Sequence, residues 1–429
     1  MSGNLYIVEL TGLHHDCAQS LLELSFQASR LKDFPFKKIV LITRKITFNR
    51  ISDQVKKSTK DNGFEVYVLD AGIDHSPSDG MIEMLKYQRK LRKHIYEEFV
   101  KTFRFTPRDT VIFVTAEMFA SPLLYRIATQ VKYHGAKVIT EVHNVFIFFP
   151  HVVKPEEVPA IRKYYLYGEG YQLLVKKFGK LGILSSLLRK QYLNSFSRRI
   201  GELSDGFLLP SIHISFPRTG RPVLRLLTRY PKKEVLNDRR KLLHSLIKKR
   251  PVVFTVPGKV NHRTRNYKPL FKAVEALKDM NIQILFNGVM ESKLTEEEFR
   301  KLPPHILKKL VISKEFVDEE TYQSRFFNSH YALIPVEFPY GKFKTTGGIG
   351  DAISVGVPII LPEGLIDTGL LPHITYTESN IADVMEKLAD LENYTELSEN
   401  ILDFSTKFTI DRMALKFNEF LQKVSEGAR

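Results

Sequence analysis

Residues 343–362, FKTTGGIGDAISVGVPIILP, join a small-residue turn, a helix-like stretch and an apolar strand. The turn is TTGG at 345–348, the helical stretch carries Asp351, and GVP at 356–358 breaks the helix before the strand. Adjacent glycines let backbone N–H groups approach a ligand closely, and the helix points its partial positive end at the same place. The stretch therefore favours a diphosphate site in an α/β sheet, with a merely tight turn as the alternative.

The composition is that of a globular chain too long for one ordinary core. Its 429 residues are 43% hydrophobic and 26% charged, which predicts two domains. No apolar run approaches the ~20 residues needed to cross a bilayer. The first residues enter a strand-like run without a leader pattern, so we expect a cytoplasmic protein. The single Cys17 excludes an internal disulfide, and its apolar helical neighbours favour a buried structural role.

Short apolar runs alternate with helical patterns in both halves of the chain. This alternation predicts βαβ units and a parallel, doubly wound sheet in each half. The predicted strands of the first half are 5–10, 38–43, 64–69, 110–115, 137–142 and 206–210. The pattern restarts with strands at 252–256, 282–286, 309–312, 331–334, 357–361 and 374–376. We expect an α/β fold of two Rossmann-like domains, with their junction near 211–250.

The charge is strongly positive and unevenly placed. The chain has 64 Lys and Arg against 48 Asp and Glu, a formal net charge of +16, which attracts polyanions. The segment 150–200 holds six Lys and four Arg against three Glu, with aromatic residues and leucines between them. Such a segment suits an anionic membrane surface; the alternative is a core-facing helix pair with a basic outer face. Nucleic acid is not expected, because no recognised module is visible and the charge is not in one block.

Four junctions in the second half carry residues suited to phosphate. Gly258 follows one predicted strand with Lys259, Arg263 and Arg265, and Asn287 with Gly288 follows the next. Pro335 and the TTGG turn follow two more. Ligands of open α/β sheets lie beyond the carboxyl ends of the strands, where all four junctions fall. Cations and backbone donors at that edge favour a nucleotide or a nucleotide-sugar.

At these motifs the chain resembles the GT-B glycosyltransferases, most closely the family 4-like enzymes. The resemblance is carried by VPGKVNHRTRNYKPLFKAV at 256–274, ILFNG at 284–288 and KFKTTGGIGDAISVGVPIILP at 342–362. It implies an N-terminal acceptor-side domain over 1–215, with 150–200 as a basic embellishment. It also implies a nucleotide-sugar-binding domain over 216–405, and a closing helix over 406–429 that packs back on the first domain across the cleft.

The resemblance also implies roles for individual residues. His143, Lys259 and Arg263 would serve the transfer step, with both cations at the donor diphosphate, and Asp351 would hold the ribose hydroxyls. The remaining donor-binding residues would be Gly258, Asn287, Gly288, Pro335, Lys344, Thr345, Thr346, Gly347 and Gly348. Gly12, His14 and Glu141 would line the acceptor side. No cofactor and no metal site are expected.

The chain departs from the family pattern at one position. The family has a pair of acidic residues eight positions apart, and where Asp351 is the second, the first position is Phe343. The resemblance implies a retaining, metal-independent transfer in which the leaving phosphate acts as base. An inverting enzyme would instead need a general base, for which Asp16, His14, Glu117, Glu141 and His143 are candidates.

The sequence thus favours a glycosyltransferase that moves a sugar from a nucleotide-sugar to a glycan or lipid-linked acceptor, as in polysaccharide biosynthesis. We expect it in the cytoplasm, with peripheral contact at the inner membrane face. The alternative is a catalytically degraded GT-B protein that binds a nucleotide or polyanion as a partner subunit. A sugar-nucleotide epimerase of the same two-domain shape is a third interpretation.

Overall fold

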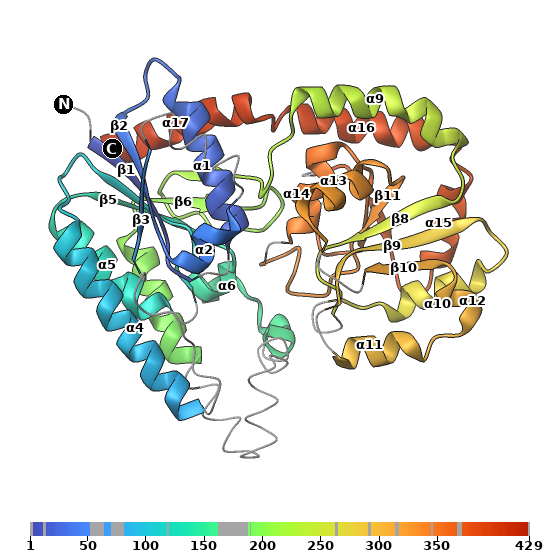
Figure 1. Cartoon of the computed structure of the whole chain (residues 1–429), viewed down its shortest axis with the longest axis horizontal. Coiled ribbons are helices and arrows are strands. Elements are labelled where there is room, and N and C mark those ends of the chain that lie inside the picture. The colour runs from blue at the N-terminus through green and yellow to red at the C-terminus, as the bar shows by residue number, and fades with distance from the viewer. Residues whose placement is uncertain are drawn as a thin grey trace.

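The computed structural model places two parallel β-sheets side by side, each covered by helices (Figure 1). It describes residues 3–11, 14–51, 64–69, 81–117, 120–161, 188, 190–261, 265–290, 293–313, 317–344, 346–366 and 371–427, without the side chains of 81–88, 293 and 294. The predicted α/β fold of two Rossmann-like domains is confirmed.

The first sheet has seven strands in the order β3-β2-β1-β4-β5-β6-β7. Their bounds are β1 (Gly3–Glu9), β2 (Phe36–Thr43), β3 (Glu65–Val68), β4 (Thr110–Phe113), β5 (Lys137–Glu141), β6 (Gly206–Leu209) and β7 (Val223–Arg225). The first six coincide with predicted strands. The sequence did not predict β7, because this three-residue edge strand has an exposed Val223 and too few apolar positions to form a pattern.

The helices of the first domain divide between the two faces of this sheet. Side chains of β1 alternate, so that Leu5 and Ile7 join one core while Tyr6 and Val8 join the other. The first core holds α1 (His15–Ser29); the second holds α4 (Met81–Thr102), α5 (Ser121–Tyr133) and the helix 190–203. The predicted apolar stripe of α4 is buried in that second core at Leu91, Ile95, Phe99 and Phe103. Short helices follow β2 and β5, at α2 (Lys45–Arg50), α6 (Val145–Phe148), η2 (Pro150–Val152) and η3 (Pro155–Glu157).

The second sheet repeats the strand order in six strands, β10-β9-β8-β11-β12-β13. They are β8 (Val252–Pro257), β9 (Ile282–Val289), β10 (Leu310–Ser313), β11 (Tyr331–Leu333), β12 (Ile359–Pro362) and β13 (Ile374–Tyr376). Its helices are α9 (Lys233–Lys248), α10 (Lys268–Ala276), α11 (Lys293–Arg300), α12 (Pro304–Leu307), α13 (Glu319–Phe327), α14 (Gly347–Val355), α15 (Ile381–Ala389) and α16 (Tyr394–Thr406). In each sheet the chain winds outward from a central pair, and in open sheets of this kind ligands bind beyond the carboxyl ends of the strands.

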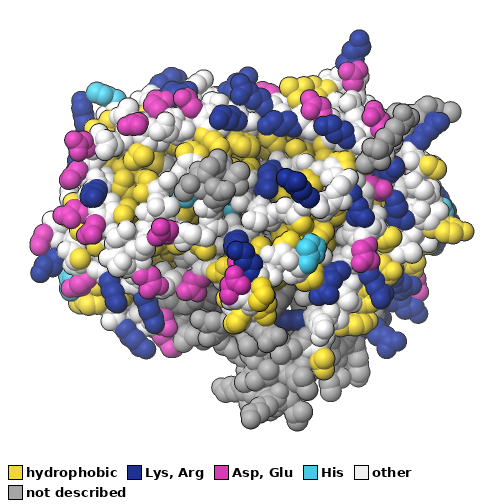
Figure 2. Space-filling view, turned by 180° about the vertical axis from the view of Figure 1, so that it is seen from behind, with side chains coloured by type: hydrophobic (Ala, Val, Ile, Leu, Met, Phe, Trp, Pro, Cys, Tyr) yellow, Lys and Arg dark blue, Asp and Glu magenta, His cyan; other side chains and the backbone are white. Residues whose placement is uncertain are grey.

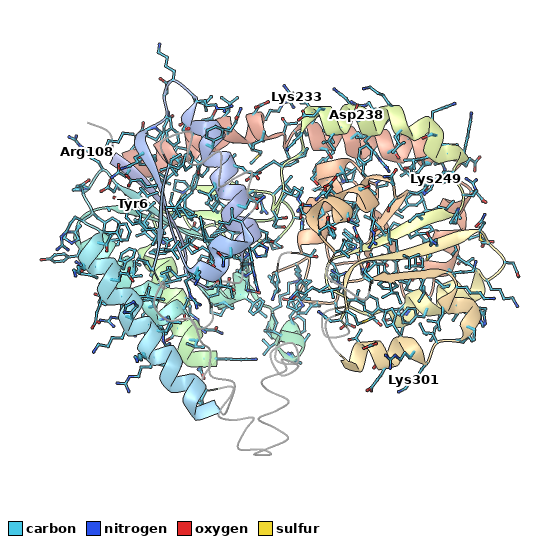
Figure 3. The ribbon with its side chains drawn as sticks, in the orientation of Figure 1. Tyr6, Arg108, Lys233, Asp238, Lys249 and Lys301 are labelled. Atoms are coloured by element: carbon cyan, nitrogen blue, oxygen red, sulfur yellow. The ribbon has the colours of Figure 1, made fainter. Side chains whose placement is uncertain are left out.

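The C-terminal helix returns to the first domain. α16 packs along α9 on the second domain, and α17 (Ile410–Glu426) then packs against α1, with Phe417 and Leu421 in the first domain's core (Figure 1). The outer side of α9 carries exposed charges such as Lys233 and Asp238 (Figure 3). Among the helices of the described ranges, none combines the length and the apolar character needed to cross a membrane.

Candidate functional site

The N-terminus of α14 is open at the place that the sequence predicted. The helix spans the predicted 347–355 and ends at Gly356, whose φ of 69° is left-handed as the GVP break requires. Thr346 is the N-cap residue, but its side chain makes no capping hydrogen bond. A Cβ on Gly347 would meet no atom within 4 Å. The N–H groups of Gly347 and Gly348 therefore have no side-chain cap at the positive end of the helix, whereas the Ile349 N–H donates to the Thr346 carbonyl at 3.4 Å. Thr345 lies outside the described residues.

The ends of β8 and β9 adjoin this helix start. A Cβ on Gly348 would lie 2.6 Å from the Pro257 side chain, so α14 begins against the last residue of β8. The next residue, Gly258, has a φ of +78° and donates its N–H to the Asn287 carbonyl at 3.1 Å. Gly288 approaches the Gly258 backbone so closely that a Cβ would be 2.2 Å from its oxygen. Asn287 and Gly288 lie inside β9 and not after it, because β9 continues to pair with the end of β8.

A buried arginine completes this corner of the site. Arg265 is 8% exposed, is held by a bridge to Val336, and places Nη2 3.0 Å from where a Gly258 Cβ would be. Its Nη1 atom is buried without a hydrogen-bond partner among the described residues. An unpaired buried guanidinium nitrogen is costly unless an acceptor arrives. The sequence assigned phosphate contacts to Lys259 and Arg263 instead. Arg263 is not among the described residues; Lys259 lies within electrostatic range of His15 on the first domain.

Asp351 is held within α14 by two neighbours. Its Oδ2 accepts a hydrogen bond from the Tyr322 hydroxyl at 2.6 Å, and its Oδ1 lies 3.4 Å from Nη1 of Arg229. Burial raises the pKa of this carboxyl despite the nearby arginine. Tyr322 in turn accepts the Asn287 side-chain amide at 2.8 Å through its carbonyl oxygen. Two predicted donor-binding residues thus share one network with Tyr322 and Arg229, which the sequence did not single out.

Pro335 lies in the turn after β11, where its carbonyl accepts the backbone N–H of Asn266 at 2.9 Å. This bond ties the Pro335 turn to the segment that carries Arg265. Pro335 therefore shapes the donor edge through its backbone.

The first domain presents a buried polar cluster after β1, β4 and β5. Nε2 of His143 lies 2.8 Å from the Val114 carbonyl and 3.4 Å from Glu141. Glu117 accepts the backbone N–H groups of His143 and Asn144 at 3.2 and 2.9 Å. Burial lowers the pKa of His143 well below its ordinary value and raises those of Glu117 and Glu141. A neutral His143 at neutral pH follows. The sequence suggested Glu117 only as a possible general base. In the structure its carboxylate holds the backbone of the loop that carries His143.

His14 stacks on His143 with ring centroids 4.1 Å apart. Burial lowers its pKa to about 4, and Lys344 acts in the same direction. Gly12, the other residue expected on this side, lies outside the described residues.

The turn before α14 joins the two domains. Asn144 and Lys344 form an antiparallel bridge, and the Val145 N–H donates to the Phe343 carbonyl at 2.9 Å. Phe343 is 1% exposed and belongs to the core of the first domain. Lys344 lies within electrostatic range of His14, His143 and Glu117. Lys344, two residues before the N-cap of α14, therefore lies near the polar cluster of the first domain.

Three side chains of the described chain could offer ligands to a metal. Ligand atoms of His14, Cys17 and His143 lie within 4.8 Å of one another. Two histidines on one ion need their ring planes to meet at that ion, whereas these rings are stacked at an interplanar angle of 23°. Burial also raises the pKa of the Cys17 thiol, which opposes the thiolate that a metal prefers. The observed rotamers suit ring stacking better than coordination.

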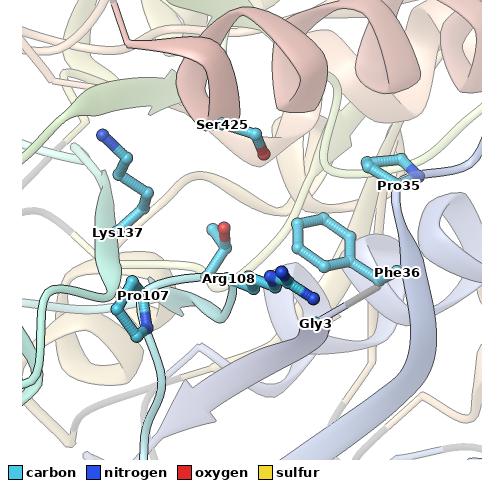
Figure 4. A pocket seen from close by; sticks show the side chains of 8 residues that line it. Gly3, Pro35, Phe36, Pro107, Arg108, Lys137 and Ser425 are labelled. Atoms are coloured by element: carbon cyan, nitrogen blue, oxygen red, sulfur yellow. The ribbon is translucent and has the colours of Figure 1, made fainter. Parts of the chain in front are cut away.

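A separate pocket of about 240 Å³ lies at the opposite edge of the first sheet (Figure 4). It includes the first residues of four strands: Gly3, Phe36, Thr110 and Lys137. Because this is the amino edge, the pocket is not part of the cleft described above.

Solved structures identify the architecture. An α,α-trehalose 6-phosphate synthase from Burkholderia multivorans matches with a TM-score of 0.55 and 9% identity over 99% of each chain. The chain has the GT-B fold. A glycosyltransferase from Rickettsia africae (TM-score 0.52, 11% identity, 99% of this chain and 98% of that chain) shares it. So does a UDP-glucosyltransferase from Polygonum tinctorium (0.52, 13%, 100% and 99%). No protein-family model and no curated protein matches the sequence. The GT-B resemblance predicted from the motifs is confirmed at the level of the fold.

Proposed function

We propose that this GT-B protein transfers a sugar from a nucleotide-sugar to a hydroxyl of a glycan or a lipid-linked acceptor. The observation that carries the proposal is the corner made by α14, Gly258 and Arg265. N–H groups at the start of α14 without a side-chain cap, open space beside Gly347, and Nη1 of Arg265, buried without a partner among the described residues, meet there. A diphosphate would supply acceptors to these N–H groups, and the positive helix end favours its charge.

The same groups suit the departure of a nucleoside diphosphate. In the proposed step the acceptor oxygen bonds to the anomeric carbon while the bond from that carbon to the phosphate oxygen breaks. The acceptor's proton passes to the leaving phosphate, so the nucleotide itself acts as base and the configuration is retained. Arg265, Lys259 and the α14 amides stabilise the charge that builds on the phosphate, a role that requires no metal ion.

The first domain would position the sugar and the acceptor. His143 is neutral and its Nε2 is held by the Val114 carbonyl, so its Nδ1 can accept a hydrogen bond from a sugar hydroxyl without bringing a charge. Lys344 lies beside the histidines and before the α14 start, so it is placed between acceptor side and phosphate. The three structures described above bear the names of sugar-transferring enzymes, which agrees with this assignment.

A second candidate function is nucleotide binding without transfer. Phe343 favours it, because the position where the family pattern has an acid is buried in the first domain. A chain of this kind would act as a partner subunit.

The test measures nucleotide binding and turnover separately. Thermal shift with UDP, GDP, ADP and dTDP should give one nucleotide that raises the melting temperature, since a ligand of the folded state stabilises it. The matching nucleotide-sugars should then release free nucleotide, and Arg265→Gln should abolish both effects. Binding without release, across a panel of glycan and lipid acceptors, would establish the second candidate. Absence of binding by all four nucleotides would refute the donor site.

A further inference from the structure

Three helices on one face of the first domain carry an exposed basic and aromatic surface. α4, α5 and the helix 190–203 lie side by side, linked by ring and cation contacts. Arg126 of α5 lies 3.8 Å over the ring of Tyr96 on α4. Arg199 lies 5.7 Å over Tyr125 of α5. These contacts fix the three helices as one layer, which we call the basic face.

Large apolar side chains protrude from the basic face instead of packing inward. Leu188 is 56% exposed and Tyr192, one turn later, is 60% exposed. Tyr192 rests on Phe196 with ring centroids 5.0 Å apart, and Phe196 contacts Tyr125 at 5.7 Å. A leucine and an amphipathic tyrosine at the tip of a packed aromatic row are unusual on a surface that meets only water.

Positive charge surrounds these side chains. Arg89, Lys90 and Lys93 are exposed on α4, and the neighbouring Arg92 lies within electrostatic range of Tyr192. No acidic residue occurs between 89 and 96 of α4; Glu97 follows, with its carboxylate 3.7 Å from Nζ of Lys93. On the half of Figure 2 that shows the first domain, Lys and Arg predominate among the charged side chains, whereas both signs are mixed over the second domain.

We propose that the basic face binds an anionic lipid membrane. Lys and Arg side chains pair with lipid phosphates, while Tyr192 and Leu188 enter the interface between head groups and acyl chains. Tyrosine is enriched at that depth because its ring is apolar and its hydroxyl polar. The sequence placed the membrane contact in 150–200; the described part of that segment supplies one helix of a surface that also includes α4 and α5. This binding is independent of the proposed sugar transfer.

The test uses the full chain and two kinds of vesicle, one of phosphatidylcholine alone and one in which about a third of the lipid is phosphatidylglycerol. We expect flotation with the anionic vesicles only, and release at high salt because the charges are screened. The chain contains no Trp, so Tyr192→Trp introduces a single tryptophan, which can be excited without the tyrosines and whose emission should shift to the blue on binding.

Matched variants separate this face from total charge. Lys90→Glu with Lys93→Glu should weaken binding about tenfold or more, whereas Lys248→Glu with Lys301→Glu, both exposed on the second domain, changes the net charge equally and should not. Tyr192→Ser should weaken binding, and Tyr133→Ser, at an 83% exposed tyrosine, should not. The proposal would be overturned if the basic-face variant and its matched control lost vesicle binding equally. So would binding of a single-stranded oligonucleotide without flotation. Nucleotide binding is measured without vesicles, so either proposal can fail alone.

Discussion

Replacing Gly347 by Ala tests the donor site with little risk to the fold. Gly347 is the first residue of α14, and a Cβ there would meet no protein atom within 4 Å. Alanine is the better helix former, so the free energy of unfolding should stay unchanged or rise by less than about 1 kcal/mol. The methyl group would, however, occupy the space through which a phosphate reaches the helix N–H groups.

The expected loss follows from the hydrogen bonds at stake. A hydrogen bond to a charged group contributes about 1.5–3 kcal/mol. Each 1.4 kcal/mol is a factor of ten in affinity, so displacing the phosphate from one N–H should weaken nucleotide binding about 10- to 150-fold. Stability and affinity should therefore move independently in this variant.

Isothermal titration with the nucleotide that the thermal screen selects would measure the dissociation constant, and urea denaturation would measure the stability. Gly348→Ala is the contrasting variant, because its Cβ would lie 2.6 Å from the Pro257 side chain and should cost about 1–3 kcal/mol by overpacking. If Gly347→Ala binds the nucleotide within twofold of the unchanged protein, the phosphate does not approach α14 and the proposed donor geometry is wrong.

Three further predictions address other parts of the structure. Arg265→Lys keeps the charge but loses the planar fork, so nucleotide affinity should fall at least about tenfold by titration, whereas Arg300→Lys at an exposed helix pair should have no effect. Phe343→Glu buries a carboxylate in an aromatic core and should lower the free energy of unfolding by at least about 3 kcal/mol; a stable variant with raised turnover would contradict the placement of Phe343. His330 accepts the Val253 N–H at 3.0 Å, contacts the Leu246 carbonyl at 2.9 Å, and has a pKa lowered to about 4 by burial. The unfolded histidine takes up a proton below about pH 6.5 and the folded one only near pH 4. The free energy of unfolding should therefore decrease as the pH is lowered from about 6.5 to about 4. The slope should be smaller by about 1.4 kcal/mol per pH unit in His330→Asn, as urea denaturation at several pH values would show.

The sequence predicted the sheets well because their strands are continuous apolar runs. Central strands of parallel sheets are buried on both faces, so runs such as 252–256 and 111–114 stand out from the helical patterns around them. β7 has no such run, since an edge strand buries less apolar surface than a central one. The helices α11 and α12 escaped prediction for a similar reason: much of 293–307 is charged and covers only the rim of the second core.

The site was predictable as a set of junctions but not as a set of contacts. The position of Gly258, Gly288 and Gly348 at one edge follows from strand order, and their backbones do adjoin. The role of Arg265 does not follow, because Lys259, Arg263 and Arg265 are equivalent cations in the sequence. Only the fold shows that Arg265 turns inward while its bridge to Val336 fixes the backbone. Likewise, no local pattern connects Arg229, in the segment between the sheets, to Asp351.

The burial of Phe343 gives a structural reason why this position carries no acidic residue, unlike the family pattern. Its side chain fills the first domain's core and its carbonyl accepts the Val145 N–H, so this residue anchors the turn that leads into α14. The next residue, Lys344, then reaches the cleft beside His14 and His143. Position 343 thus contributes an apolar anchor, and the adjacent Lys344 brings a positive charge beside the two histidines, which favours a negatively charged ligand there. Since the turn is held by both domains, the geometry of the α14 N-terminus depends on how they pack. Weakening the Asn144–Lys344 bridge should therefore alter nucleotide affinity even though Asn144 lies on the first domain.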